Sequence, residues 1–190
     1  MLCMVGWTTV NGFEISQPDQ SDWSAKRIAS YEEYSDIGPV MAVLRVPGRN
    51  IEAAVFPDSL RKGLEAGVAW VGSTSMPGEA GNIAIAGHRD SFFRRLENVP
   101  MGTLIELETD AGVELYEVDK VSIVDALDVS PLDQTGEDVI SLITCHPFYY
   151  EGYAPDRYVV RARRVSPLLS MTEPAGPVDE SSGLVLTKEE

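Results

Sequence analysis

TLIELETDAGVELYEVDKVSIV, residues 103–124, is the stretch that decides the fold class of this chain. Apolar and polar residues alternate on both sides of the central DAG, as they do along half-buried strands whose successive side chains point to opposite faces. The three residues 110–112 separate the two runs and have the turn-forming character of a hairpin loop. The stretch therefore predicts two antiparallel strands, residues 103–109 and 112–124.

Further β-type runs lie on both sides of this hairpin. They cover residues 40–46, 51–56, 82–88, 139–145 and 157–165. Strands joined by turns, without alternating helices, favour a closed or nearly closed barrel over a doubly wound sheet. We expect an all-β barrel with seven or eight strands and short helices.

The 190 residues suffice for one compact domain with short appendages. We interpret residues 38–166 as the barrel and 1–37 as a lead-in, with a weak helical pattern over 21–34 and Ser21 as its candidate cap. Residues 57–71 suggest a short helix that ends near Gly67. Beyond the barrel, residues 167–190 are rich in Pro, Ser, Gly and acidic residues, which predicts a disordered tail.

Composition excludes several function classes. With 15 Lys and Arg against 30 Asp and Glu, the formal charge is −15, so the chain has no basic field for a nucleic acid partner. Two cysteines, Cys3 and Cys145, cannot build a disulfide framework. The apolar start, residues 1–7, lacks the features of a signal peptide and falls short of the roughly 20 residues that span a bilayer.

Cys145 follows the apolar run LIT and precedes His146, and the motif GHRD at residues 87–90 carries the other histidine, His88. Together these residues raise three interpretations. A protein-kinase interpretation of GHRD, residues 87–90, fails because Arg95 stands where the catalytic loop needs an asparagine. A zinc site would need more ligands than His88, His146, Asp90 and Cys145 can bring together, since strand alternation sends Cys145 and His146 to opposite faces. We therefore expect no metal.

The third interpretation pairs Cys145 as nucleophile with His88 as base, each at the end of an expected strand. A nearby imidazole can accept the thiol proton or stabilise the thiolate. Arg157 opens the next strand and would lie beside Cys145 if the two strands pair antiparallel, where it could stabilise an oxyanion. Taken alone, each residue also has a structural explanation: an inert buried cysteine, a hydrogen-bonded histidine and a solvated strand-edge arginine.

Three motifs together resemble the sortase family. They are GNIAIAGHRDSFFRRL at 81–96, SLITCHPF at 141–148 and APDRYVVRA at 154–162. The resemblance spans about residues 40–164, and the last two motifs look most like the class D branch. It implies an eight-stranded barrel and a cysteine transpeptidase in which His88, Cys145 and Arg157 are catalytic, with no cofactor.

The implied reaction cleaves an LPxTG-like sorting signal through an acyl-thioester on Cys145. His88 would protonate the departing glycine amine, and Arg157 would hold the oxyanion. The implied partners are a protein with a C-terminal sorting signal and an amine acceptor, either a peptidoglycan precursor or a pilin lysine. Two alternatives remain open: a hydrolytic cysteine peptidase on the same barrel, and a catalytically silent peptide-binding barrel.

The family's substrate groove is walled by the loop before the cysteine strand, residues 125–138 here. Its apolar Ala126, Leu127, Val129 and Leu132 are candidates to hold the signal, although they could equally pack the loop onto the barrel. Thr144, next to the nucleophile, is a further candidate substrate-binding residue.

The chain also departs from the family pattern. Ser141 stands where many relatives have threonine, and His146 where they often have tyrosine or an acid. Relatives are anchored in the membrane with the barrel facing the periplasm or the cell exterior. The resemblance implies the same localisation here, with the short apolar start consistent with the end of a truncated anchor.

Overall fold

The fold is seen in a computed structural model, which describes residues 7–10, 12–34, 38–57, 62–150 and 152–169. The strands are β1 Trp7–Val10, β2 Phe13–Ser16, β3 Ala42–Val46, β4 Ile51–Phe56, β5 Val68–Trp70, β6 Asn82–Ala86, β7 Leu104–Thr109, β8 Gly112–Asp125, β9 Val139–His146 and β10 Asp156–Leu169. The helices are α1 Ala25–Tyr34 and α2 Gly63–Ala66, with 3-10 turns at Pro47–Arg49, Arg94–Leu96 and Ser130–Leu132.

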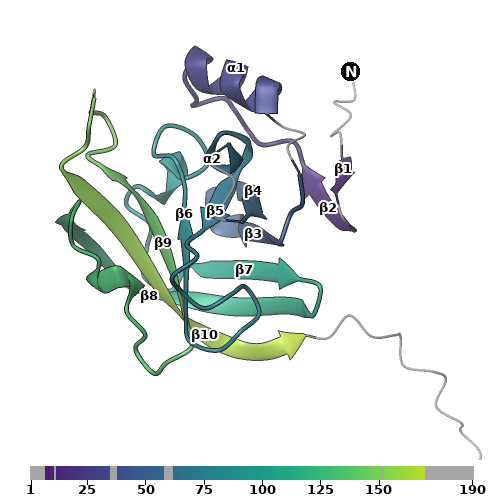
Figure 1. The fold of residues 1–190 in the computed structure, drawn as a ribbon, viewed down its shortest axis with the longest axis vertical. Coiled ribbons are helices and arrows are strands. Elements are labelled where there is room, and N and C mark those ends of the chain that lie inside the picture. Colours follow the sequence, from purple (N-terminus) through teal and green to yellow (C-terminus); the bar gives the residue numbers. More distant parts are fainter. Residues whose placement is uncertain (1–6, 11, 35–37, 58–61, 151, 170–190) are drawn as a thin grey trace, which may run out of the picture.

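Eight of the strands close into a barrel in the order β10-β8-β7-β3-β4-β5-β6-β9. The eight-stranded closed barrel is thus confirmed. Most neighbours are antiparallel, but β4 with β5 and β6 with β9 run parallel. Figure 1 shows the long strands β8, β9 and β10 side by side along one wall.

The hairpin that decided the fold class forms as expected. Strands β7 and β8 pair antiparallel from Leu104 opposite Glu117 to Thr109 opposite Gly112. Alternate side chains of β7, Ile105 and Leu107, are fully buried in the barrel core. A large cluster of aliphatic and aromatic side chains fills the barrel, and each of the eight barrel strands contributes to it. A second, smaller cluster, which includes Phe13, Val43 and Phe56, packs against β3 and β4.

Several elements differ from the sequence expectations. Strands β1, β2 and β5 were not predicted from the sequence, because runs of three or four residues are too short to show a period. The cap of α1 is Ser24 and not Ser21: its hydroxyl accepts the backbone N–H of Arg27 at 3.3 Å. At the other end of the chain β10 runs on to Leu169, three residues beyond the expected barrel boundary. Most of the expected tail, residues 170–190, lies outside the described residues.

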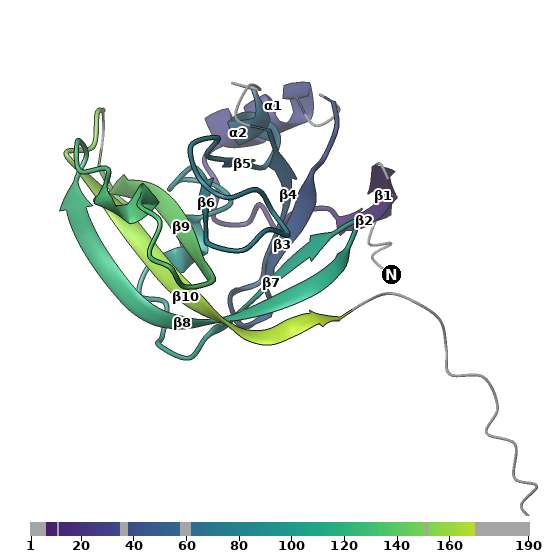
Figure 2. The same ribbon diagram turned by 60° about the horizontal axis from the view of Figure 1, so that its bottom comes forward.

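Helices α1 and α2 lie together at one end of the barrel in both ribbon views (Figure 1, Figure 2). Helix α1 rests on the barrel through an edge-to-face aromatic cluster, in which the rings of Trp23 and Tyr31 contact Phe92 at centroid distances of 4.7 and 6.0 Å. Within the described residues, neither helix has the length and apolar character needed to cross a membrane.

Candidate active site

Strands β6 and β9 run parallel and bring His88 and Cys145 to the same edge of the barrel. Their register pairs Ala86 with Ile143, and each candidate residue follows two positions later. The backbone N–H of Gly87 donates to the carbonyl of Ile143 at 3.0 Å, which carries the pairing one residue further. The parallel pairing therefore places the expected base level with the expected nucleophile.

Cys145 and His146 point to opposite faces of β9, as strand alternation predicts. The His146 ring stacks on Tyr158, with centroids 6.0 Å apart and planes 25° apart. Tyr158 and Phe148, which also contacts the His146 ring, belong to the buried core. His146 thus takes part in packing the barrel interior, while Cys145 is partly exposed on the outer face.

Thr144 lies on the inner side, although the sequence analysis named it as a substrate-binding candidate. Its side chain is 2% exposed, and its hydroxyl donates to the carbonyl of Gly87 at 2.7 Å. This hydrogen bond ties the turn that carries His88 to strand β9. Thr144 therefore supports the site from within and offers no open surface to a peptide.

Arg157 stands directly opposite Cys145 in the antiparallel pairing of β9 with β10. Its other neighbour is Val124 on β8, so the three side chains share the outer face of the barrel. The guanidinium donates from Nη1 to the carbonyls of Ala154 at 3.3 Å and Asp156 at 2.9 Å. The antiparallel pairing on which the placement of Arg157 depended is thus confirmed.

His88 occupies a largely buried position with charged groups around it. Its Nε2 lies 3.5 Å from Oε1 of Glu65, close enough for attraction but longer than an ordinary hydrogen bond. Burial is the main cause that lowers the pKa of His88 below its ordinary value of 6.5, and the Arg27 guanidinium acts in the same direction. The carboxylates of Glu65 and Asp90 oppose this shift without reversing it. The imidazole is therefore mainly neutral at pH 7, which is the form that can accept a proton from a thiol.

The turn that carries His88 is fixed by close packing. A Cβ atom at Gly87 would lie 2.6 Å from Cδ2 of Phe93, so only glycine allows the ring to approach the backbone here. Phe93 is fully buried, and its backbone N–H donates to the carbonyl of His88 at 3.1 Å. The position of His88 is thus tied to the barrel core.

The outer face of β8, β9 and β10, which carries Cys145 and Arg157, is hollowed beside Val124, the β8 neighbour of Arg157. We call this hollowed surface the groove. It contains a cavity of about 200 Å³ whose floor includes Val159, Arg161 and Lys120. Loop residues 130–135 form one wall of this cavity. The cavity thus combines charged side chains with a largely apolar surface, and it lies on the face that carries Cys145 and Arg157.

The loop that walls the groove is held by Asn82, at the start of β6. The amide nitrogen of this 1% exposed side chain donates to the carbonyls of Pro131 at 2.8 Å and Asp133 at 3.0 Å. Its amide oxygen accepts the hydroxyl of Ser141 at 3.0 Å, and its backbone N–H donates to the Gln134 side chain at 2.9 Å. The loop is thus fastened to β6, the strand that leads to His88.

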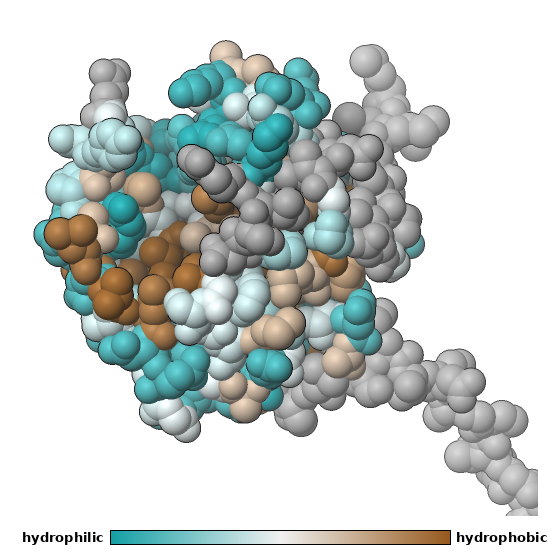
Figure 3. All heavy atoms as spheres, in the orientation of Figure 1, coloured by the Kyte–Doolittle hydropathy of each residue, from teal (hydrophilic) through white to brown (hydrophobic). Residues whose placement is uncertain are grey.

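The four apolar loop residues named from the sequence fall into two groups. Ala126 and Leu132 are half-buried against the barrel, whereas Leu127 and Val129 are 88% and 65% exposed. Figure 3 shows hydrophobic surface gathered on the side where β8 ends and this loop begins. Leu127 and Val129 are thus open to a partner, and the other two contribute to packing.

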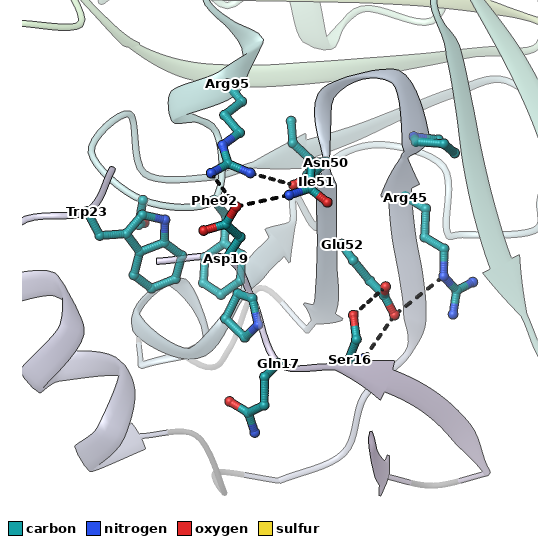
Figure 4. A pocket seen from close by; sticks show the side chains of 13 residues that line it. Ser16, Gln17, Asp19, Trp23, Arg45, Asn50, Ile51, Glu52, Phe92 and Arg95 are labelled. Carbon is teal, nitrogen blue, oxygen red and sulfur yellow. Dashed lines mark hydrogen bonds and ion pairs between the residues drawn. The ribbon is translucent and has the colours of Figure 1, made fainter. Parts of the chain in front are cut away.

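A larger cavity, of about 340 Å³, lies elsewhere, between residues 16–23 and strands β3 and β4 (Figure 4). Its charged groups are satisfied by one another: Arg95 pairs with Asp19 at 2.8 Å, and the Ser16 hydroxyl donates to Glu52 at 2.7 Å. None of the three candidate catalytic residues lines it. Its interactions attach the N-terminal segment to the barrel.

Two residues beside His88 were not found from the sequence. Glu65 belongs to α2 and Arg27 to α1, and both are far from His88 in the chain. No motif or spacing links them to the histidine, because the tertiary fold alone brings α1 and α2 against the His88 turn. Among the residues that the structure describes, no group of three His, Cys, Asp or Glu side chains could hold a metal ion.

Comparison with known proteins identifies the fold and the family. A family model described as a Sortase domain matches residues 44–165. Sortase D of Bacillus subtilis (strain 168) is 34% identical over 154 residues, which make up 80% of this chain and 77% of that protein. Sortase C-1 from Actinomyces oris superposes with a TM-score of 0.62 at 24% identity, covering 75% of this chain and 84% of its own. A Clostridium perfringens Sortase D5 transpeptidase superposes with a TM-score of 0.61 at 24% identity, covering 77% and 92%.

The two solved structures support the barrel fold, and the B. subtilis protein supports the expected likeness to sortases of class D. The family model covers most of the barrel, from β3 into β10. The resemblance inferred from the three sequence motifs is confirmed. The chain therefore belongs to the sortase family of cysteine transpeptidases.

Proposed function

We propose that this protein cleaves an LPxTG-like sorting signal and joins the freed carboxyl end to an amine of the cell envelope or of a pilin. The observation that carries the proposal is that strand pairing brings three groups to one edge of the barrel. Cys145 lies opposite Arg157 on β10 and level with His88 after β6. A nucleophile, a proton acceptor and an oxyanion donor are the groups that acyl transfer needs.

In the first half of the proposed reaction, neutral His88 takes the proton of the Cys145 thiol. The sulfur attacks the threonine carbonyl, and the resulting oxyanion is held by the Arg157 guanidinium. Collapse of this intermediate breaks the threonine–glycine C–N bond and forms a thioester. The proton on His88 passes to the departing glycine amine.

In the second half, an amine attacks the thioester and the C–S bond breaks. His88 takes the proton from the attacking amine and returns it to the sulfur. A thioester is intrinsically more susceptible to amines than an oxygen ester, and a shielded groove disfavours water. We expect slow hydrolysis when no amine is present.

The groove along β8, β9 and β10 is the proposed seat of the peptide. Leu127 and Val129 would contact the apolar residues of the signal; their exposed side chains on the loop before β9 support this assignment. The acceptor is a peptidoglycan precursor or a pilin lysine, and the barrel would act at the membrane, facing the periplasm or the cell exterior. Membership of the sortase family supports these assignments.

Product analysis by liquid chromatography and mass spectrometry tests the proposal. The full chain is incubated with a panel of LPxTG-type peptides, each with and without triglycine and a lysine-bearing peptide. Cys145→Ala serves as the inactive variant, and Cys3→Ala is the matched control because it removes the other cysteine of the chain.

Cleavage between threonine and glycine, with ligation to the added amine, is expected for the wild type and for Cys3→Ala but not for Cys145→Ala. Hydrolysis alone across all amines would replace the transpeptidase with a hydrolytic peptidase. Peptide binding without any cleavage, unchanged in Cys145→Ala, would indicate a silent binding barrel.

A further inference from the structure

One carboxylate joins the N-terminal helix to the proposed catalytic histidine. Oε2 of Glu65 accepts the Arg27 guanidinium at 2.6 Å, while its other oxygen, Oε1, lies 3.5 Å from Nε2 of His88. The same guanidinium donates from Nε to Asp90 at 2.9 Å. Arg27 therefore binds two carboxylates. That of Glu65 is directed at His88, and that of Asp90 lies two positions after His88 in the chain.

These contacts are shielded from solvent and built into the fold. The side chains of Arg27 and Glu65 are 17% and 27% exposed, so their pairing is screened less than that of a surface ion pair. Helix α1 is fixed at its start by Ser24 and is held against the His88 turn by the contacts of Trp23 and Tyr31 with Phe92. The position of Arg27 is thus set by the docking of α1.

A base that is itself oriented by a third group is a recurring arrangement in enzymes with an activated nucleophile. Glu65 can fill that place, because its free oxygen faces the ring nitrogen and would attract the imidazolium that forms when His88 takes the Cys145 proton. Arg27 counters this attraction by engaging the other oxygen. The pair thus balances the two protonation states that His88 must alternate between.

The other charged groups near His88 do not replace this pair. Asp90 favours the imidazolium but is itself engaged by Arg27. Arg89, next to the histidine, donates to the carbonyls of Tyr150 at 2.6 Å and Gly152 at 3.2 Å on the loop between β9 and β10.

We propose that Glu65 and Arg27 are positioning residues that orient His88 for proton transfer, so that the N-terminal helix α1 is a working part of the active site. This inference rests on the proposed function in taking His88 as the group that moves protons. It extends the site beyond the three residues of the sequence motifs. It also assigns a role in the reaction to the lead-in segment, which the sequence analysis treated as an appendage.

The test uses the opposite charges of the two residues. The imidazole of His88 is titrated by NMR in the full chain, with its signal assigned by loss in His88→Gln. Glu65→Gln removes a carboxylate that stabilises the imidazolium, so the midpoint should fall; Arg27→Met removes a competing cation, so it should rise. We expect shifts of about half a pH unit or more in each direction. Lys26→Met is the matched control, since it removes the same charge from an exposed neighbour on α1.

Activity gives the second readout. The lower limb of the pH profile of kcat/KM should move with each midpoint, and thermal unfolding checks that each variant is folded. The inference would be overturned if the titration midpoint of His88 did not change, or if it moved in the same direction in Glu65→Gln and Arg27→Met. Arg27 and Glu65 would then have only a structural role.

The same measurements separate this inference from the proposed function. Opposite shifts of the His88 midpoint in the two variants, without any cleavage of sorting peptides by the wild type, would support the electrostatic contact of Glu65 and Arg27 with His88. The same result would refute the proposed transpeptidase function. Normal cleavage with unchanged pH profiles in both variants would refute the positioning role and leave the proposed function standing.

Discussion

Arg157 and Cys145 are direct partners across the antiparallel pairing of β9 and β10, so their side chains emerge on the same face of the barrel. This relationship is set by backbone register and not by a flexible loop. In the proposed reaction, the Arg157 guanidinium would stabilise the oxyanion of the tetrahedral intermediate on Cys145.

Replacing Arg157 by alanine should lower kcat for sorting-peptide cleavage by about 10²–10³-fold, the usual effect of losing one oxyanion donor. The rate at which iodoacetamide alkylates Cys145 should change little, because alkylation forms no oxyanion. Arg163→Ala is the control: Arg163 lies on the same strand, its side chain is 51% exposed, and among the described residues it forms ion pairs only with Glu137 and Asp119. Equal losses in the two variants would contradict a catalytic position for Arg157.

Exchanging Leu127 and Val129 for serine should weaken peptide binding and leave the thiol chemistry intact. Removing two exposed apolar contacts should raise KM for the sorting peptide about three- to tenfold with kcat retained. Val165→Ser provides the comparison, since Val165 is 53% exposed on the far part of β10. An unchanged KM in the double variant would show that the two side chains do not contact the peptide.

Gly87→Ala should destabilise the fold and the His88 turn together. The added methyl group would lie within 3 Å of the Phe93 ring, which is fully buried and cannot move away freely. We expect the free energy of unfolding in urea to fall by about 1–3 kcal/mol, with a parallel loss of cleavage. Gly48→Ala is the control, because among the described residues beyond its chain neighbours no heavy atom lies within 4 Å of a Cβ at that position. Full stability in Gly87→Ala would show that the turn tolerates a Cβ.

The lowered pKa of His88 predicts how stability depends on pH. Below the ordinary value of 6.5 the unfolded chain takes up a proton at this position before the folded chain does. Protonation of His88 therefore favours unfolding as pH falls from 6.5 toward the lower folded pKa, and it contributes nothing above that range. His88→Gln should lose less stability than the wild type between pH 7 and pH 5, measured by urea unfolding. A steeper loss in the variant would contradict the sign of the shift.

The β-barrel could be predicted from the sequence because the strand alternation and turn residues that indicate it lie within short local stretches. Residues 103–124 carry their alternation and their turn within one stretch, and the hairpin forms with the expected bounds to within one residue. Strand β5 was not predicted, because its three residues show no period and its parallel pairing with β4 is made only in the tertiary fold.

The residues of the candidate site also fall into those that local strand geometry predicts and those that only the tertiary fold brings together. Cys145 and Arg157 could be placed from the sequence, because strand alternation and antiparallel pairing fix which side chains share a face. Thr144 was misplaced as a substrate contact, although the same alternation assigns it to the inner face with His146. Glu65 and Arg27 had no sequence signal, since their approach to His88 depends on how two helices dock at one end of the barrel.

The central claim is that Cys145 carries the peptide as a thioester, and intact-mass spectrometry of the full chain tests it most directly. The protein is mixed with an LPxTG-type peptide without an amine and is quenched in acid at short times. The account predicts an adduct equal to the acyl fragment on the wild type and on Cys3→Ala, which disappears with formation of a ligated product when triglycine is added. Absence of this adduct at every time for a peptide that is cleaved, or an equal adduct on Cys145→Ala, would contradict it.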